Sequence, residues 1–151
     1  MFRFARLLRL ATTGAALVVT SMLSLNAYAD DQETIDYRVH VMKTMGEQTD
    51  AIGMILEKKA PPDNFATHVK ILAVTASQAK KAFEPKVVGG NAKPEVWANW
   101  ADFSKRLDEL AANTGELATA AQHESVTAIG TKLRSALKCK SCHDTYRLPL
   151  K

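Results

Sequence analysis

The residues that most constrain this chain stand near its C-terminus, where Cys139 and Cys142 enclose two residues and His143 follows directly. On a helix, residues three and four positions apart share one face. Both thiols can then reach the two vinyl groups of one porphyrin, while the imidazole lies beneath the iron as its proximal ligand. The C-x-x-C-H spacing therefore predicts one covalently attached haem c with its iron.

Three other uses of a C-x-x-C pair are open at this point. A thioredoxin-like redox pair would need a βαβ surround, and no such pattern is visible. A zinc site usually has four protein ligands, but the chain has only two cysteines, and His40, His68 and His123 are not at zinc-finger spacing. A plain disulfide would form in an oxidising compartment. We favour haem attachment because His143 follows Cys142 directly and an export signal precedes the domain.

The first 29 residues have the pattern of a secretory signal peptide. Three arginines precede an interrupted apolar run, and an A-x-A cleavage site stands at residues 27–29. The alternative, an uncleaved membrane anchor, is disfavoured because Thr, Ser and Gly break the apolar run. Residues 1–29 are therefore predicted to be removed, which leaves a mature domain of residues 30–151 in the periplasm with no membrane attachment.

The charge of the chain argues against a nucleic-acid partner. The formal net charge is +4, and the signal peptide carries three arginines and no acidic residue, so only +1 belongs to the mature domain. Nucleic-acid binding needs a clustered basic face, which a nearly balanced chain does not predict. The mature chain has the size of one domain.

Helical periodicity dominates this domain, and strand-like alternation is almost absent. Apolar residues recur in steps of three and four over about residues 33–59, 65–83, 94–121 and 126–136, the last run leading straight into Cys139. Asp63 is the expected N-cap of the second helix. Four helices with short connections predict an all-α, antiparallel up-down-up-down four-helix bundle, with one haem held between the helices at the end of the fourth.

The chain resembles the class II c-type cytochromes, which comprise cytochrome c-prime and its low-spin, methionine-ligated relatives. The matching residues are Tyr37-Arg38 followed by Met42-Lys43 and Gly46, Phe83-Glu84-Pro85 before Gly89-Gly90, Ala92 to Trp97 leading to Phe103, and the terminal Cys139 to Arg147. The resemblance covers essentially the whole mature chain. The C-terminal haem motif also distinguishes it from class I cytochromes, which carry the motif near the N-terminus.

The resemblance implies roles for residues outside the motif. Arg38 matches an arginine close to the haem propionates, and Arg147 matches a basic residue on the proximal side, near His143. Met42 matches the family position whose side chain faces the distal side of the iron. Met45 lies on the same helical stripe, and Gly46 leaves room for a porphyrin edge or for a moving methionine.

The expected function depends on Met42. In the low-spin relatives a methionine at this position binds the iron, and thioether sulfur raises the potential of haem iron, which suits electron transfer. In cytochrome c-prime the residue is unbound, and the five-coordinate iron takes up nitric oxide or carbon monoxide. We expect electron transfer with Met42 as sixth ligand and Met45 as the substitute, and we keep the gas-binding protein as the alternative.

The expected partners follow from these two functions. They are redox proteins of the periplasm for the first and small gases for the second. The sequence shows no acid–base pair or activated nucleophile, so no enzymatic activity is expected. Cytochrome c-prime proteins are commonly homodimers, and apolar residues at the expected outer positions of the first helix, Val39, Val41 and Ile55, favour a dimer here.

Overall fold

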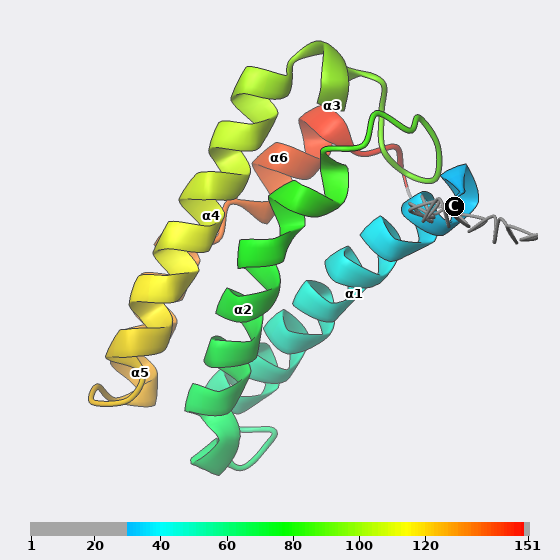
Figure 1. Ribbon diagram of the computed structural model, residues 1–151. Coiled ribbons are helices and arrows are strands. Elements are labelled where there is room, and N and C mark those ends of the chain that lie inside the picture. The colour runs from blue at the N-terminus through cyan, green and yellow to red at the C-terminus, as the bar shows by residue number, and fades with distance from the viewer. Residues whose placement is uncertain (1–29, 150–151) are drawn as a thin grey trace, which may run out of the picture.

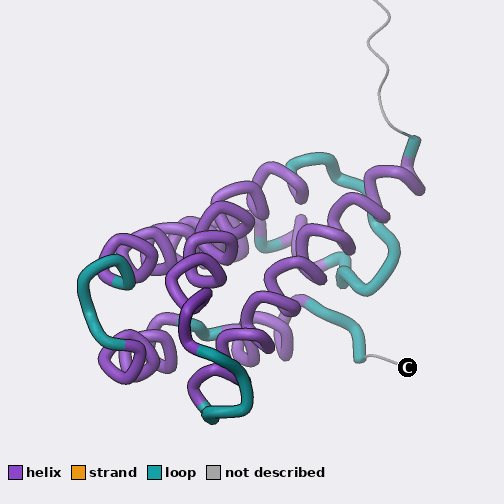
Figure 2. The backbone as a smooth tube through the Cα atoms, turned by 90° about the horizontal axis from the view of Figure 1, so that it is seen from below, coloured by secondary structure: helices purple, strands orange, loops and turns teal. Residues whose placement is uncertain are grey.

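The described part of the chain is built from helices. The computed structural model describes residues 30–149, and within them no strand is present, so Figure 2 draws only helix and loop there. In chain order the elements are α1 (Asp31–Leu56), a 3-10 turn (Pro62–Asn64), α2 (Phe65–Phe83), α3 (Glu95–Ala98), α4 (Trp100–Ala120), α5 (Val126–Ala136) and α6 (Cys139–Tyr146) (Figure 1). The predicted signal peptide lies outside the described residues.

The predicted four-helix bundle is confirmed, with α5 and α6 together in the place of the fourth helix. α2 packs along both α1 and α4, and α5 contacts α4 and α1. The expected continuous fourth helix is interrupted at Leu137, whose backbone is extended with φ −88° and ψ 96°. The expected third helix is likewise interrupted, at Asn99, which separates α3 from α4. The C-x-x-C-H motif therefore forms a separate helix, α6, which contacts α3 and α4. None of the described helices has the length and apolar character needed to cross a membrane.

Local chemistry explains where α1 begins, but not where α2 begins. α1 starts with a capping box, in which Asp30 Oδ1 accepts a hydrogen bond from the Glu33 amide (2.8 Å) and the Asp30 amide donates to Glu33 Oε2 (3.2 Å). The prediction that Asp63 caps α2 is wrong, because Asp63 lies inside the preceding 3-10 turn and no side chain caps this helix.

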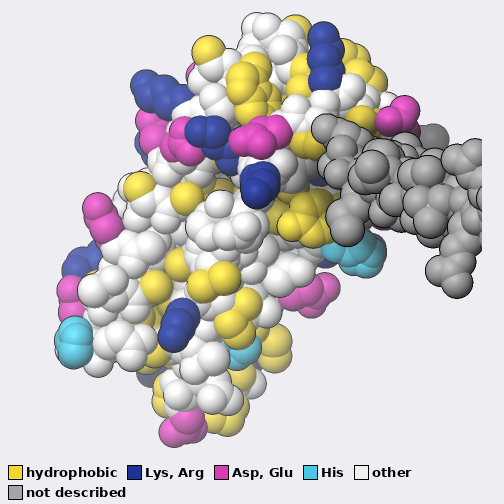
Figure 3. All heavy atoms as spheres, viewed as in Figure 1, with side chains coloured by type: hydrophobic (Ala, Val, Ile, Leu, Met, Phe, Trp, Pro, Cys, Tyr) yellow, Lys and Arg dark blue, Asp and Glu magenta, His cyan; other side chains and the backbone are white. Residues whose placement is uncertain are grey.

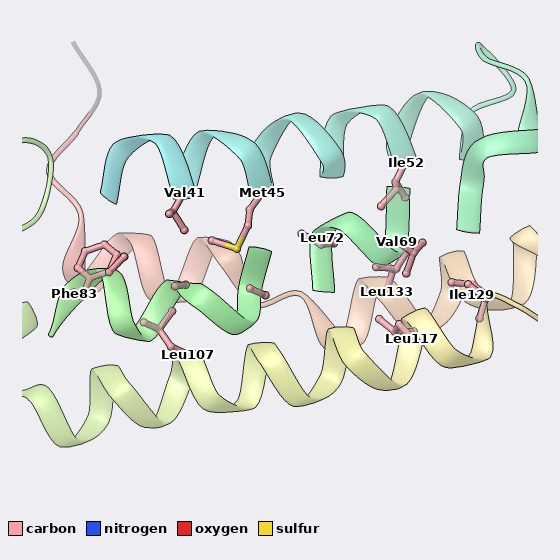
Figure 4. Close-up of a cluster of buried hydrophobic side chains, with 14 of the residues drawn as sticks. Val41, Met45, Ile52, Val69, Leu72, Phe83, Leu107, Leu117, Ile129 and Leu133 are labelled. Carbon is pink, nitrogen blue, oxygen red and sulfur yellow. The ribbon is translucent and has the colours of Figure 1, made fainter. Parts of the chain in front are cut away.

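The predicted apolar stripes form the core of the bundle. Burial of these side chains is the main force holding the helices together, at about 25 cal/mol for each Å² removed from water. Val69 of α2 and Ile129 of α5 are fully buried. The labelled core residues in Figure 4 are Val41, Met45, Ile52, Val69, Leu72, Phe83, Leu107, Leu117, Ile129 and Leu133.

One prediction about α1 is wrong. Val41 and Ile55, expected on its outer face, are only 8 % and 6 % exposed and belong to the core, and Val39 is half-buried. α1 contacts both α2 and α5, and its buried and half-buried positions cover a face wider than a single seven-residue stripe. These side chains therefore give no support to the expected homodimer.

The surface carries charges of both signs. On the face drawn in Figure 3, Lys and Arg side chains lie among Asp and Glu side chains. Exposed ion pairs join Lys80 to Asp108 (2.8 Å), Lys132 to Glu124 (2.6 Å) and Lys140 to Asp144 (2.6 Å). Such exposed pairs contribute at most about 1 kcal/mol each to stability, so the apolar core carries the fold.

The loop over residues 84–94, which follows α2 in the chain, contacts both α1 and α6. Gly89 has φ 152°, in the range that favours glycine, and a Cβ there would lie 2.5 Å from Ile35 Cδ1 of α1. At the other end of the loop, the Lys93 amide donates a hydrogen bond to the Tyr146 carbonyl of α6 (3.0 Å). The loop thus joins two helices that are far apart in the sequence.

Candidate haem-binding cavity

A cavity of about 730 Å³ lies between α1, α4 and α6, with further walls from α2 and the 84–94 loop. Cofactor sites in proteins commonly measure about 300–1,000 Å³, so this cavity has the size of a cofactor site. It is lined by all eight residues predicted to surround haem, namely Arg38, Met42, Met45, Gly46, Cys139, Cys142, His143 and Arg147. The fold thus brings together residues 38–46 and residues 139–147, which lie near opposite ends of the domain's sequence. Their roles toward haem stay predictions.

The α6 wall presents the two cysteines in helical form. Cys139 is the first residue of α6, and Cys142 lies one turn later. Both thiols are free, so no disulfide joins them. Cys139 is exposed and Cys142 half-buried, and partial loss of solvent around the two sulfur atoms raises the pKa of both thiols, so both are neutral at pH 7. Two free thiols one helical turn apart on a cavity wall suit attachment to one porphyrin.

His143 also belongs to the α6 wall. It is half-buried, and its pKa is lowered first by burial and then by the nearby charge of Arg147. The imidazole is therefore neutral at pH 7, which is the form that binds a metal.

The two remaining alternatives for the motif find no support in the described chain. Residues 30–149 contain no group of three or more His, Cys, Asp or Glu side chains that could hold a metal ion, so a zinc site lacks its ligands. The same residues form no strand, and a thioredoxin-like βαβ surround is absent from them.

The α1 wall is built from residues one turn apart. Met45 is 8 % exposed and points from α1 into the interior of the bundle (Figure 4). Met42 is half-buried beside it and packs against the same core. A Cβ at Gly46 would meet no heavy atom within 4 Å, so this position opens the wall. The α1 side thus offers two thioethers and open space to a bound group.

Arg38 is a buried cation on the same wall. Its side chain is 3 % exposed, and Nη1 and Nη2 donate hydrogen bonds to the carbonyls of Val87 (2.7 Å) and Gly89 (3.3 Å). The guanidinium lies 5.4 Å from the ring centroid of Phe83 and 5.0 Å from that of Trp97. Burial lowers the pKa of Arg38, but an arginine stays protonated in proteins. No carboxylate of residues 30–149 forms an ion pair with it.

Sequence reasoning missed three polar residues that line the cavity, two from α4 and one from α6. The Tyr146 hydroxyl donates a hydrogen bond to Asp102 Oδ2 (2.6 Å), and Arg106 Nε donates to the same oxygen (2.7 Å). These two bonds lower the pKa of Asp102, whereas burial and the bond to Asp102 raise the pKa of Tyr146 to about 12. Asp102 and Arg106 are four residues apart and could be paired from sequence, but nothing local links either to Tyr146.

Comparison with known proteins gives a consistent result. A family model described as Cytochrome C' matches residues 33–147. A cytochrome c' from Rhodospirillum rubrum is 33% identical over 142 residues, which cover 88% of this chain and 94% of that protein. A cytochrome c-556 from Agrobacterium tumefaciens is 31% identical over 124 residues, which cover 78% of this chain and 97% of that protein.

Solved structures show the same fold. The cytochrome c prime from Shewanella frigidimarina superposes with a TM-score of 0.70 at 22% identity, covering 81% of this chain and 99% of the other. A nitric oxide complex of a cytochrome c prime variant from Alcaligenes xylosoxidans has a TM-score of 0.70 at 25% identity, with the same coverage. A carbon monoxide complex of another variant of that protein aligns equally well. The chain therefore belongs to the cytochrome c' family, whose members carry covalently bound haem c with its iron.

Proposed function

We propose that this monohaem cytochrome binds small uncharged gases, nitric oxide or carbon monoxide, at an iron position that faces Met42. The observation that carries this function is the cavity itself, which has one imidazole on the α6 wall and, at Met42, Met45 and Gly46 of the α1 wall, two thioethers and open space. The nitric oxide and carbon monoxide complexes of the related cytochrome c prime support it. They favour this alternative over the electron transfer that we expected first.

Three residues of α6 would hold the haem. Cys139 and Cys142 would form the thioethers, and His143 would bind the iron through its neutral imidazole. When bound, haem supplies an iron with one position left for a diatomic ligand. The chain's own contribution is to orient that iron, since α6 is held by its contacts to α3 and α4.

Arg38 would provide the positive charge for the haem propionates. A buried cation without a carboxylate partner is costly, and Arg38 is such a cation within the described residues. Two carbonyls and two aromatic rings hold its guanidinium in place at the cavity wall. A propionate there would supply the missing negative charge and a charge-assisted hydrogen bond.

The part of the α1 wall formed by Met42, Met45 and Gly46 would select for small apolar ligands. Met42, Met45 and the nearby Leu72 of α2 offer no hydrogen-bond donor to the cavity. A polar or charged ligand would lose its hydration there without compensation. A diatomic gas loses little hydration, so it is the ligand class that this wall admits.

Electron transfer is the second candidate. The observation that favours it is the presence of Met42 and Met45 on one wall of the cavity, because either thioether could bind the iron. Relatives named cytochrome c-556 and cytochrome c-555 also align along most of the chain. Under this function Met42 would be the sixth ligand, and redox proteins would be the partners.

Residues 1–29 are proposed to act as a cleaved signal peptide, which would place the haem protein in the periplasm. We assign no enzymatic reaction to it. The homodimer expected from the sequence stays a prediction without support from Val41 and Ile55.

The visible spectrum of the purified holoprotein tests the proposed function. Gas binding predicts a high-spin ferric spectrum, a broad visible band after reduction, and ready uptake of carbon monoxide. A low-spin ferric spectrum with a weak near-infrared sulfur-to-iron band, together with resistance to carbon monoxide, would establish the electron-transfer candidate instead.

A further inference from the structure

Tyr146, Asp102 and Arg106 form a hydrogen-bonded cluster at the edge of the haem cavity, called here the Tyr146 cluster. Tyr146 is 4 % exposed, and its ring packs edge-on against Phe103 with the centroids 5.1 Å apart. Asp102 Oδ2 accepts hydrogen bonds from both Tyr146 (2.6 Å) and Arg106 (2.7 Å). The guanidinium of Arg106 also lies 5.7 Å from the centre of the Tyr146 ring.

We propose that the Tyr146 cluster has two roles. It anchors α6 to α4, and its charges set the reduction potential of the haem. Asp102 would favour the oxidised iron through its charge, and the hydroxyl of Tyr146 and the guanidinium of Arg106 would each moderate that effect. This role rests on the proposed attachment of haem through Cys139 and Cys142, with His143 bound to its iron. It does not depend on whether the sixth position is open.

The anchoring role follows from the contacts of α6. Tyr146 lies three residues after His143 and four after Cys142, so all three share one face of the helix. Within residues 30–149, the bond from Tyr146 to Asp102 is the one side-chain hydrogen bond between α6 and α4. A displacement of Tyr146 would therefore move the proposed iron ligand.

The electrostatic role follows from charge and placement. All three members of the cluster line the cavity, as do Cys142 and His143. Oxidised haem iron carries one more positive charge than reduced iron, so a nearby carboxylate stabilises the oxidised state and lowers the potential. Hydrogen-bond donors to that carboxylate weaken its field. Since Asp102 is partly open to solvent, screening keeps the effect moderate.

Midpoint potentials of holoprotein variants, measured by spectroelectrochemistry, test this role. Asp102→Asn removes the negative charge and should raise the potential. Tyr146→Phe keeps the ring packing but removes one donor to Asp102, so it should lower the potential. Arg106→Gln removes a cation near the carboxylate and should lower it as well.

Lys140→Met is the matched control. Lys140 forms an exposed ion pair with Asp144 on the same helix (2.6 Å), outside the residues that line the cavity. It should change the potential less than any of the three cluster variants. A purely mechanical anchor would instead give a shift in Tyr146→Phe, which removes the hydrogen bond, and little or none in Asp102→Asn, whose amide oxygen still accepts it.

A raised potential in Asp102→Asn together with a lowered potential in Tyr146→Phe supports the electrostatic role. Any other combination of signs, or shifts no larger than that of Lys140→Met, overturns it. If Asp102→Asn does not fold, a raised or unchanged potential in Arg106→Gln overturns it equally. A low-spin wild-type spectrum would defeat the proposed gas binding, while the signs of these shifts would still decide the role of the cluster.

Discussion

The guanidinium of Arg38 lies 5.0 Å from the ring centroid of Trp97, and the Trp97 indole donates a hydrogen bond to the carbonyl of Phe83 (2.9 Å). The cation is thus enclosed by side chains from α2 and α3 that are themselves fixed. Two loop carbonyls complete the enclosure. This arrangement keeps a charged group at the wall of an otherwise largely apolar site, where a propionate would meet it.

Replacing Arg38 with lysine should destabilise the protein despite the conserved charge. An ammonium cannot donate to two carbonyls in the fork geometry of a guanidinium or stack on the rings in the same way. Leaving one buried carbonyl without a donor costs about 1–3 kcal/mol. Denaturant unfolding should show this loss, whereas the exposed Arg134→Lys should leave stability unchanged. Equal stabilities of the two variants would contradict the described enclosure.

Covalent attachment of haem should depend on both cysteines of α6. Protein produced with a cytochrome c maturation system should remain coloured on a denaturing gel and carry the mass of one haem. The double variant Cys139→Ser and Cys142→Ser should lose the colour, because a hydroxyl does not form the thioether. Extraction of the wild-type haem with acidified acetone would show that no thioether exists.

Removing the Met42 side chain should speed gas binding without changing the spin state. The half-buried thioether occupies part of the proposed distal space, so Met42→Ala should raise the rate of carbon monoxide binding several-fold in stopped-flow measurements. Met54, 50 % exposed and outside the cavity, provides the control, and Met54→Ala should bind carbon monoxide at the wild-type rate.

Conversion of a low-spin wild type into a high-spin protein by Met42→Ala would identify Met42 as an iron ligand. If the same conversion occurred in Met45→Leu and not in Met42→Ala, the ligand would be Met45.

Two glycine substitutions should change stability in opposite directions. Gly90 has φ 60°, and a Cβ there would lie 2.9 Å from Ile35 Cγ2. Gly90→Ala should therefore cost about 1–2 kcal/mol from the left-handed backbone alone. Gly115 lies inside α4 with no heavy atom within 4 Å of its Cβ position, so Gly115→Ala should stabilise the protein by about 0.5–1 kcal/mol. Thermal unfolding of both variants measures the difference.

Stability should fall at high pH because of Tyr146. Burial and the hydrogen bond to Asp102 raise the pKa of Tyr146 from 10.0 in the unfolded chain to about 12 in the folded protein. Below pH 10 the tyrosine is protonated in both states, so its contribution is fully present. It is lost as the pH rises toward 12, because the unfolded state then releases a proton that the folded state retains. Tyr146→Phe should show a smaller decline than wild type over this range.

Local chemistry made part of the site predictable. The C-x-x-C-H spacing places its three side chains on one face when the motif is helical, and α6 has that form. The three- and four-residue steps likewise predicted which face of α2 and α4 is buried, since one face of a surface helix packs against the core. A short connection between helices leaves few arrangements other than antiparallel neighbours. Fold class and haem motif were therefore readable from sequence.

The burial of Val41 and Ile55 was decided by tertiary structure. A single seven-residue stripe describes a helix with one contact surface, but α1 packs against two neighbours. Which side of a helix receives the second neighbour depends on how the whole bundle closes. The separation of α6 from α5 was also decided by tertiary structure. The helix breaks at Leu137, and no glycine or proline stands there to predict the break.

The polar contacts around the cavity also needed the folded chain. Arg38 meets Val87 and Gly89 about fifty positions away, and Tyr146 meets Asp102 across 44 positions. Hydrogen bonds act over about 3 Å and leave no periodic trace in a sequence. The sequence by itself determined the helical bundle, the C-x-x-C-H motif, and Met42 and Met45, which line the same cavity as that motif. Only tertiary packing decided which charged groups surround the cavity, because that depends on distances between segments that the chain connects only through its fold.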